Sequence, residues 1–304
     1  MEYLMTYGWA ILIIAVILGA LFSLGFFNSA SLAPKVSPGA CIVERPYGPG
    51  TSAYATLQGT CNNELPQYVA QFNGENSITV NPYGTPAPDA LLNNQPDFTI
   101  TAWVYVNNYG TPNLDPAIYS EGVPDITLLF GLNANDGLTL NEWNSNLLPN
   151  NWAGFGSSVQ VPLHQWVFVA GTLSDGGVNT GSSTLYLNAQ SVSGNAGQEE
   201  NTGGYTTHYF GIGANTGGDL GGGQSPQTWN GYIANLQIYN ASLSQNAIMF
   251  IYHEGIGGVP TSLNHLVAWW PLNGNANDYS GNQNNGRNAN IVYTNSWTSS
   301  YSAP

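Results

Sequence analysis

Short runs of alternating apolar and polar residues, separated by Gly, Asn, Pro and Asp, constrain this fold more than any other feature. They recur from residue 67 to residue 239 with the length and spacing of β-strands, which predicts an all-β sandwich of many antiparallel strands. The clearest run is FTITAWVYV at 98–106, where Trp103 and Tyr105 share a face that fits a covered or ligand-bearing sheet surface. The opposite face is expected in the core and carries Phe98, Ile100, Ala102, Val104 and Val106.

One later segment, residues 243–260, has the pattern of a helix. Ser242 or Ser244 is the expected N-cap, and glycines and Pro260 follow the last turn. The face that would pack on the sandwich consists of Ala247, Ile248, Ile251 and Tyr252.

The first thirty residues are a second, separate feature. Residues 10–27 form an uncharged run that is long enough for a membrane-spanning helix. We predict one long hydrophobic α-helix over residues 1–30. Ala15, Gly19 and Ser23 recur every four residues, a stripe along which another helix can approach closely. An ordinary single-pass membrane anchor is the alternative.

The charge of the chain excludes one class of partner. Lys and Arg number 3 against 17 Asp and Glu, and the net charge is −14. Because binding to phosphate backbones needs clustered basic residues, we expect no nucleic-acid partner. A chain in which 7% of the residues are charged is also expected to lose little stability in acid, which suggests an acidic habitat. A neutral secreted surface is the alternative.

Cys41 and Cys61 are the only cysteines, and an even pair in an exported chain predicts a disulfide. They lie in a segment rich in Pro and Gly, residues 31–66, which we expect to be a linker between the helix and a domain at 67–304.

The domain resembles the laminin-G-like, concanavalin A-like jelly-roll family. The last part of the chain, LVAWWPLNGNANDYSGNQNNG at 266–286, resembles the segment that normally opens such a domain. Circular permutation, with residues 264–295 closing the sandwich, is the preferred explanation, and a truncated second domain is the alternative. The matching segments are AQFNG at 70–74, FTITAWVYV at 98–106, VPLHQWVFVAGTL at 161–173, LYLNAQSV at 185–192 and WNGYIANLQIYNASLSQNAI at 229–248.

The start of the chain, MEYLMTYGWAILII, resembles archaeal type IV pilin-like subunits that carry class III signal peptides. In that family a basic leader is removed before a Gln-x-Ser-x-Glu-x-x-x-Leu stretch, so Glu2 corresponds to the family's acidic residue. No Gln-x-Ser precedes Glu2, so the chain is either a processed form or starts downstream of the natural start. The resemblance implies a helix that waits in the membrane and then packs among its copies in a filament, with Glu2, Ala15, Gly19 and Ser23 serving assembly.

The Asn-rich loop at 273–285 is the densest cluster of oxygen ligands. In related jelly rolls an Asp-x-Ser-Gly loop often carries a structural calcium ion, which implies Asp278 as a ligand, with Asn275 beside it. A metal-free turn held by its own hydrogen bonds is the alternative.

A glycan site is expected near Trp143 and Trp152, in an amide-rich segment outside any clear strand. The alternative is that both tryptophans plug the edge of the sandwich, whereas Trp103, Trp166 and Trp229 are expected in the core. Asn240 begins a glycosylation sequon.

The sequence offers no paired carboxylates and no nucleophile elbow, so we expect a protein that is not an enzyme. A secreted glycosidase ranks last. The preferred hypothesis is a structural subunit of an archaeal type IV pilus-like filament on the cell surface, whose copies assemble through their helices and whose lectin-like domain binds glycans or cell surfaces. The alternative is a monomeric, membrane-anchored carbohydrate-binding protein.

Overall fold

The computed structural model divides the chain into two compact units, residues 1–38 and 39–304, which are described separately. It describes residues 12–17, 41–49, 51, 55–59, 61, 65–80, 91–92, 95–109, 115–121, 128–143, 152–174, 183–199, 210–214 and 228–304.

In the first unit, residues 12–17 are helical, and the long helix predicted over residues 1–30 is evident only there. Five apolar side chains of this helix are 52–63% exposed. Ala15 belongs to the helix and is exposed, whereas Glu2, Gly19 and Ser23 lie outside the described residues. Within the described parts of the chain, no helix combines the length and apolar character that crossing a membrane requires.

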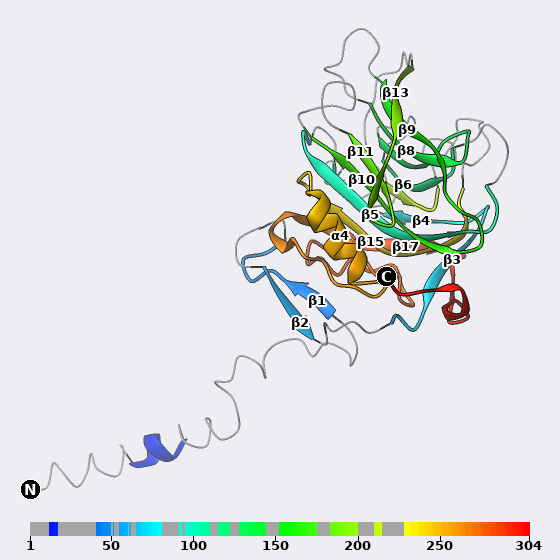
Figure 1. The fold of residues 1–304 in the computed structure, drawn as a ribbon. Helices are drawn as coiled ribbons and strands as arrows, with labels where there is room; N and C mark the ends of the chain where they lie inside the picture. The colour runs from blue at the N-terminus through cyan, green and yellow to red at the C-terminus, as the bar shows by residue number, and fades with distance from the viewer. Residues whose placement is uncertain are drawn as a thin grey trace, which may run out of the picture. The chain divides into compact units, whose positions relative to one another are not determined.

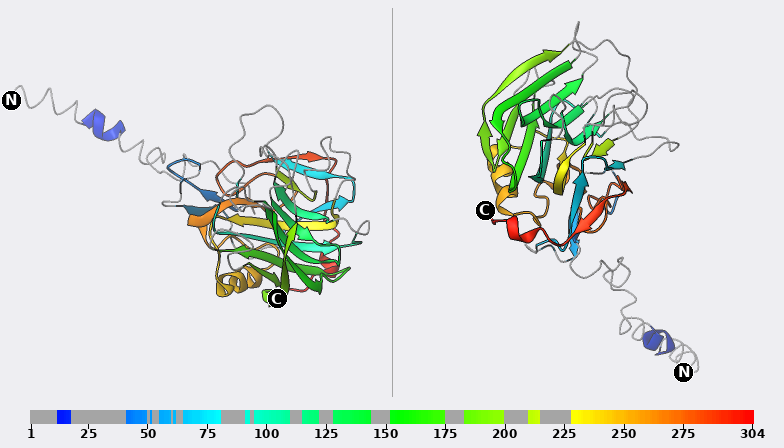
Figure 2. Two further views of the ribbon diagram at one scale, coloured as in Figure 1. Left: turned by 90° about the horizontal axis from the view of Figure 1, so that it is seen from above. Right: turned by 90° about the vertical axis from the view of Figure 1, so that its right-hand side faces the viewer.

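The second unit is an all-β antiparallel sandwich, which confirms the predicted fold class. Its described strands form two eight-stranded sheets that face each other (Figures 1 and 2). The first sheet has the order β12 (Gln190–Val192), β11 (Thr184–Leu187), β10 (Trp166–Leu173), β5 (Phe98–Val106), β15 (Asn230–Tyr239), β3 (Val69–Asn73) and β18 (Val292–Thr294), with β16 (Leu266–Trp270) also paired to β15. The second has the order β13 (Gly194–Glu199), β9 (Trp152–Gln160), β8 (Gly137–Trp143), β7 (Leu128–Leu132), β6 (Ala117–Glu121), β14 (Phe210–Ile212), β4 (Ser77–Val80) and β17 (Gly286–Ala289).

The alternation of β5 decides which of its faces lies in the core. The predicted inner residues of this strand all belong to the cluster between the two sheets, together with Phe130 and Leu140 from the second sheet. Trp103 belongs instead to a second cluster on the outer face of the first sheet. The predicted bounds of β5 are confirmed to the residue, because the strand is long and strongly apolar.

A helix and the end of the chain cover part of that outer face. Helix α4 (Gln245–His253) is capped by Ser244, and its Ile248 and Ile251 are buried, as the sequence predicts. Tyr252 of α4 stacks on Trp103 with ring centroids 5.7 Å apart, and Figure 1 shows α4 against β5, β10 and β15. A short 3-10 helix, Leu263–His265, follows, and a second one, Thr298–Ser300, lies near the C-terminus.

The last forty residues complete both sheets. Strand β16 pairs with β15 and β18 pairs with β3, whereas β17 adds to the edge of the second sheet beside β4 (Figure 2). Trp270 and Leu272 are fully buried in the core between the sheets. Residues 264–295 therefore close the sandwich, and a circular permutation as the origin of this order stays a prediction.

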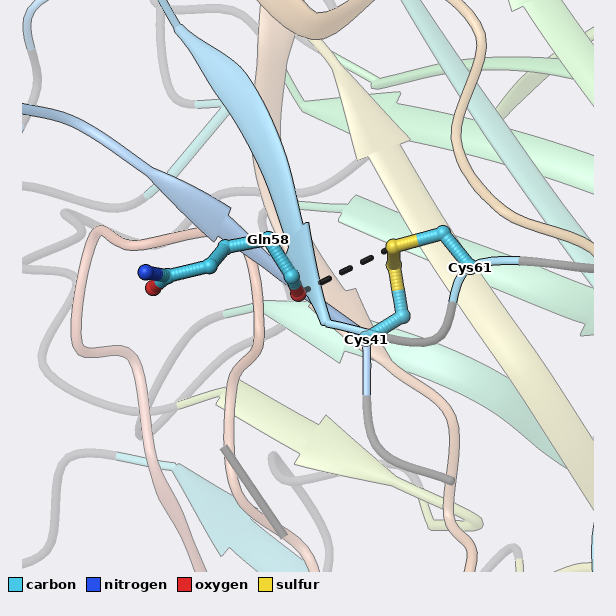
Figure 3. Close-up of a disulfide and its surroundings, with 3 residues drawn as sticks. All are labelled: Cys41, Gln58 and Cys61. Atoms are coloured by element: carbon cyan, nitrogen blue, oxygen red, sulfur yellow. Dashed lines mark hydrogen bonds between the residues drawn. A yellow bond between two sulfur atoms is a disulfide. The ribbon is translucent and has the colours of Figure 1, made fainter. Parts of the chain in front are cut away.

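The cysteine pair forms the predicted disulfide, with Cα atoms 4.9 Å apart (Figure 3). It joins a small hairpin of β1 (Cys41–Glu44) and β2 (Thr56–Gly59), and the Cys61 sulfur lies 3.7 Å from the carbonyl oxygen of Gln58. The segment expected to be a linker thus contains a hairpin that packs on the sandwich.

Arg45, which follows β1, holds this hairpin in place. Its guanidinium donates to the carbonyl oxygens of Ser280 at 2.9 Å and Leu266 at 2.6 Å, and also to those of Leu263 and Thr51. Burial lowers the pKa of Arg45, and the nearby Asp278 partly offsets that effect.

Candidate functional site

A line of side chains crosses the outer face of the first sheet on four adjacent strands. Gln71 of β3 pairs with Tyr232 of β15, Tyr232 pairs with Tyr105 of β5, and Tyr105 pairs with Trp166 of β10. Directly opposed residues of antiparallel strands point to the same face, so this register brings three aromatic rings together. We call Tyr105, Trp166 and Tyr232 the aromatic triad.

The three rings of the triad touch one another. The centroid of Tyr105 lies 5.3 Å from that of Tyr232 and 5.9 Å from that of Trp166, and the last two are 6.0 Å apart. Such distances are typical of packed aromatic pairs, so the rings form one cohesive surface.

Within the described part of the chain, the triad is covered at the end formed by Trp166. Trp166 is 7% exposed, because the ring of Trp297 packs edge-on against it at 6.0 Å and the indole N–H of Trp166 donates to the Trp297 carbonyl oxygen at 3.3 Å. Tyr105 and Tyr232 are half-buried, and their hydroxyl groups form no hydrogen bond with any residue that the structure describes. The open part of the triad therefore presents two phenol rings whose hydroxyl groups have no partner among the described residues.

Polar side chains border the triad near the ends of the same strands. Asn73 of β3 pairs with Asn230 of β15, and the amide nitrogen of Asn107 lies 3.4 Å from the amide oxygen of Asn230. We call Asn73, Asn107 and Asn230 the amide row. His164 is exposed beside them, with its ring centroid 6.3 Å from that of Tyr105.

Gly231 allows β15 to approach β5 closely between the triad and the amide row. Its φ is +149°, and a Cβ atom built on it would lie 1.9 Å from the carbonyl oxygen of Tyr105. No side chain fits that space, so the spacing of Tyr105 and Tyr232 depends on this glycine.

This combination of groups suits a carbohydrate. Aromatic faces pack against the C–H faces of sugar rings, and amide and phenol groups can both donate and accept hydrogen bonds from hydroxyl groups. The arrangement has the binding elements of a sugar site.

The loop predicted to bind calcium is held by its own hydrogen bonds. Asp278 Oδ1 accepts from the backbone N–H of Trp269 at 3.0 Å and of Ser280 at 2.8 Å. Its Oδ2 accepts from the Ser280 hydroxyl at 2.8 Å and the Asn284 N–H at 2.9 Å. The Asn275 side-chain oxygen accepts from the N–H of Asn277 at 2.9 Å.

These oxygens are therefore engaged with N–H and O–H donors of the protein itself. Among the described residues, no group of three or more His, Cys, Asp or Glu side chains is placed to hold a metal. Burial raises the pKa of Asp278, and its hydrogen bonds from Trp269, Ser280 and Asn284 partly oppose that rise. The geometry agrees with the alternative expectation, a metal-free Asx-rich turn, and calcium binding stays a prediction.

The prediction that Trp143 and Trp152 lie outside the strands is wrong. Trp143 ends β8 and Trp152 begins β9. The register places them directly opposite each other. The hairpin extends further than the sequence suggested, since its Asn- and Gly-rich ends carry few strand-forming residues. Their side chains lie outside the described residues, so their glycan-binding role stays a prediction. Asn240 is exposed at the end of β15, and its glycosylation also stays a prediction.

Glu121 is a carboxylate buried on β6, where it accepts from the Tyr119 hydroxyl at 2.7 Å and from the N–H of Leu92 at 3.1 Å. Burial, followed by the charge and hydrogen bond of Glu121, raises the pKa of Tyr119 well above its ordinary value. Its full burial makes Glu121 a structural acceptor.

Sequence reasoning placed Tyr105 on the relevant face but did not identify the site. Trp229 lies in the predicted core, whereas Trp103 and Trp166 are buried in the cluster on the outer face. Tyr232 was missed because only the pairing of β15 with β5, strands separated by more than one hundred residues, brings it beside Tyr105. The sequence does carry one signal for Tyr232. It lies in the predicted strand WNGYIANLQIY, where alternate side chains point to the outer face.

A family model described as the concanavalin A-like lectin/glucanases superfamily matches residues 74–249. A search of curated proteins found no match. Among solved structures, a candidate carbohydrate binding protein from Bacteroides ovatus is 16% identical with a TM-score of 0.49, covering 75% of this chain and 60% of that one. A heptameric SAP-like pentraxin from Limulus polyphemus is 16% identical with a TM-score of 0.36, covering 66% of this chain and 82% of that one.

The sialidase carbohydrate-binding module CBM40 of Ruminococcus gnavus, bound to sialyllactose, is 12% identical with a TM-score of 0.40, covering 62% of this chain and 98% of that one. The chain thus spans about three fifths of the Bacteroides protein.

Proposed function

We propose a carbohydrate-binding function for this chain, which belongs to the concanavalin A-like lectin/glucanases superfamily. The observation that carries the proposal is the half-buried pair Tyr105 and Tyr232, which lies beside the amide row on the outer face of the first sheet. The family includes both binding proteins and enzymes, so its name does not choose between these activities. The chemistry of the triad favours binding without catalysis.

The physical reason is the position of the two phenol rings. A sugar that stacks on them removes apolar surface from water and gains about 25 cal/mol for each Å². The rings are fixed by contact with Trp166, so little conformational freedom is lost when a ligand binds. The amide row then offers hydrogen bonds to the hydroxyl groups at the rim of the sugar.

The test is a screen of soluble oligosaccharides against the full chain. Titration calorimetry then measures the dissociation constant of each oligosaccharide that binds. Tyr105→Ala and Tyr232→Ala are each expected to weaken binding at least about tenfold, which corresponds to about 1.4 kcal/mol. Tyr105→Phe retains the ring and is expected to lose less binding affinity than Tyr105→Ala.

The matched control is Tyr47→Ala, because Tyr47 is 68% exposed on the disulfide-linked hairpin. Binding that all three alanine variants weaken equally, or that none of them weakens, would refute the proposed site.

We propose further that the N-terminal run assembles with copies of itself, making the chain a subunit of a pilus-like filament on the cell surface. The observation that favours this is the helix at 12–17, whose apolar side chains Leu12, Ile13, Ile14, Val16 and Ile17 are exposed and need a partner. A membrane is the partner before assembly in this proposal, and a monomeric, membrane-anchored binding protein is the alternative.

Electron microscopy of the purified chain tests this second proposal. Filaments are expected, and Gly19→Leu is expected to abolish them because it blocks close helix packing. Only detergent-released monomers in the wild-type preparation would support the anchored alternative.

A further inference from the structure

The outer face of the first sheet is unusual in its lack of charge. None of its eight strands contains Asp, Glu, Lys or Arg, as their sequences QSV, TLYL, WVFVAGTL, FTITAWVYV, NGYIANLQIY, VAQFN, VYT and LVAWW show. Strands of soluble proteins normally place some charged side chains on a solvent-facing surface. A ligand on the aromatic triad therefore meets rings and amides and no formal charge from these strands.

The two basic residues that the structure describes lie outside the strands of the first sheet. There are three Lys and Arg residues in total. Arg45 is bonded to backbone carbonyl oxygens at the hairpin, and Arg287 lies on β17 of the second sheet, where it pairs with Thr79. Lys35 lies in the other unit of the chain and outside the described residues.

An acidic residue follows β3, next to the amide row in the chain. The backbone N–H of Glu75 donates to the side-chain oxygen of Asn73 at 2.9 Å, which places this acidic residue in the turn directly after β3. With a net charge of −14, the protein as a whole also repels anions within the Debye length, about 10 Å at 0.1 M salt.

We infer that the aromatic triad and amide row select neutral glycans and discriminate against glycans that carry uronic acid, sialic acid or sulfate. This inference rests on the proposed carbohydrate-binding function and names the ligand class of the same site. A carboxylate brought against the triad loses hydration, and the strands provide no cation to compensate for that loss. A neutral hydroxyl group loses less hydration and finds its partners in the amides and in the hydroxyl groups of Tyr105 and Tyr232.

At Tyr105 and Tyr232 the backbone offers no substitute for the missing cation. Anions can be held by clusters of unpaired N–H groups, but β15 and β5 are interior strands, and the register pairs both tyrosines with a strand on each side. Discrimination at this site therefore depends on its side chains, which can be exchanged.

The experiment measures dissociation constants for matched pairs of oligosaccharides: lactose and sialyllactose, cello-oligosaccharides and their C6-oxidised counterparts, and chitin and hyaluronan oligosaccharides. At pH 7.5 and 0.15 M salt, the wild-type chain is expected to bind at least one neutral member through Tyr105 and Tyr232. Its anionic counterpart is expected to bind at least about tenfold more weakly. The affinity for the neutral member is expected to be independent of salt.

A charge variant tests the cause of this discrimination. Gln71 lies next to Tyr232 and is partly exposed, so Gln71→Lys places an ammonium group at the edge of the triad. Gln71→Lys is expected to reduce the ratio of the two dissociation constants, anionic over neutral, by roughly threefold. That is the effect expected of one exposed ion pair. Gln71→Met is the control of matched length and is expected to leave the ratio unchanged.

The outcomes separate the two claims. If an anionic member binds as tightly as its neutral counterpart and its binding requires Tyr105, the inference about ligand class is overturned and the site remains. If Gln71→Met changes the ratio as much as Gln71→Lys does, charge is not the cause and the inference is also overturned. If no member binds, or if binding is independent of both tyrosines, the proposed function itself fails, and the inference fails with it.

Discussion

Asp278→Ala tests whether this carboxylate holds the closing segment by hydrogen bonds or through a metal ion. The wild-type side chain accepts from the backbone N–H groups of Trp269, Ser280 and Asn284. Removing it leaves three N–H donors in a part-buried environment, and each unsatisfied donor costs about 1–3 kcal/mol. Some will be reached by water, so we expect the free energy of unfolding to fall by about 3–5 kcal/mol.

Urea unfolding followed by tryptophan fluorescence measures this loss, because Trp269 and Trp270 precede the loop. Wild type and variant are compared in millimolar calcium and in EDTA. The hydrogen-bond account predicts the same loss in both solutions, with no effect of EDTA on the wild type. A wild type that EDTA destabilises to the level of Asp278→Ala would refute the account and establish a calcium ligand.

The remaining predictions concern pH, the disulfide and a glycine. Burial raises the folded-state pKa of Asp278, so the folded state binds more protons above about pH 4, and the stability of wild type relative to Asp278→Asn should fall as pH rises through that window in a pH series of urea titrations. Replacing Cys41 and Cys61 together by Ser opens a loop with a sequence separation of 20 and should cost about 3 kcal/mol in the same assay, whereas an unchanged midpoint would contradict it. Gly231→Ala should cost about 2–5 kcal/mol and weaken glycan binding, because its Cβ would meet a carbonyl oxygen of β5 at 1.9 Å, while Gly48→Ala, with φ +98° and no atom within 4 Å, should cost less and leave binding intact.

Local patterns were sufficient to predict the sandwich. Strand β5 and helix α4 each carry their signal in contiguous residues, the first by alternation and the second by Ser244 and the spacing of Ile248 and Ile251. The disulfide was predictable because the chain has two cysteines, which leave one possible pairing.

The candidate site depends on long-range pairing that no local pattern encodes. Tyr105 and Tyr232 meet through the register of β5 with β15, and Gln71 joins them through β3. Trp297, close to the C-terminus, packs on Trp166, whereas Tyr105 and Tyr232 are only half-buried. The sequence pattern favours Trp143 and Trp152 instead, because tryptophans among amides have the composition of a sugar site whatever their position in the fold.

The role of Asp278 shows a different limit of the sequence. A loop rich in Asn, Asp, Ser and Gly has the composition of a cation site and of a self-bonded turn alike. The two differ only in whether the oxygens face an ion or neighbouring N–H groups, as the bonds from Trp269 and Asn284 illustrate. Composition cannot decide that orientation.

A crystal structure of the chain with the tightest-binding oligosaccharide tests the central claim most directly. The account predicts a sugar ring in van der Waals contact, about 4 Å, with Tyr105 and Tyr232, and with hydroxyl groups bonded to the amide row. A sugar bound on the second sheet, or at the end of the β8–β9 hairpin, with the triad open to solvent, would contradict it.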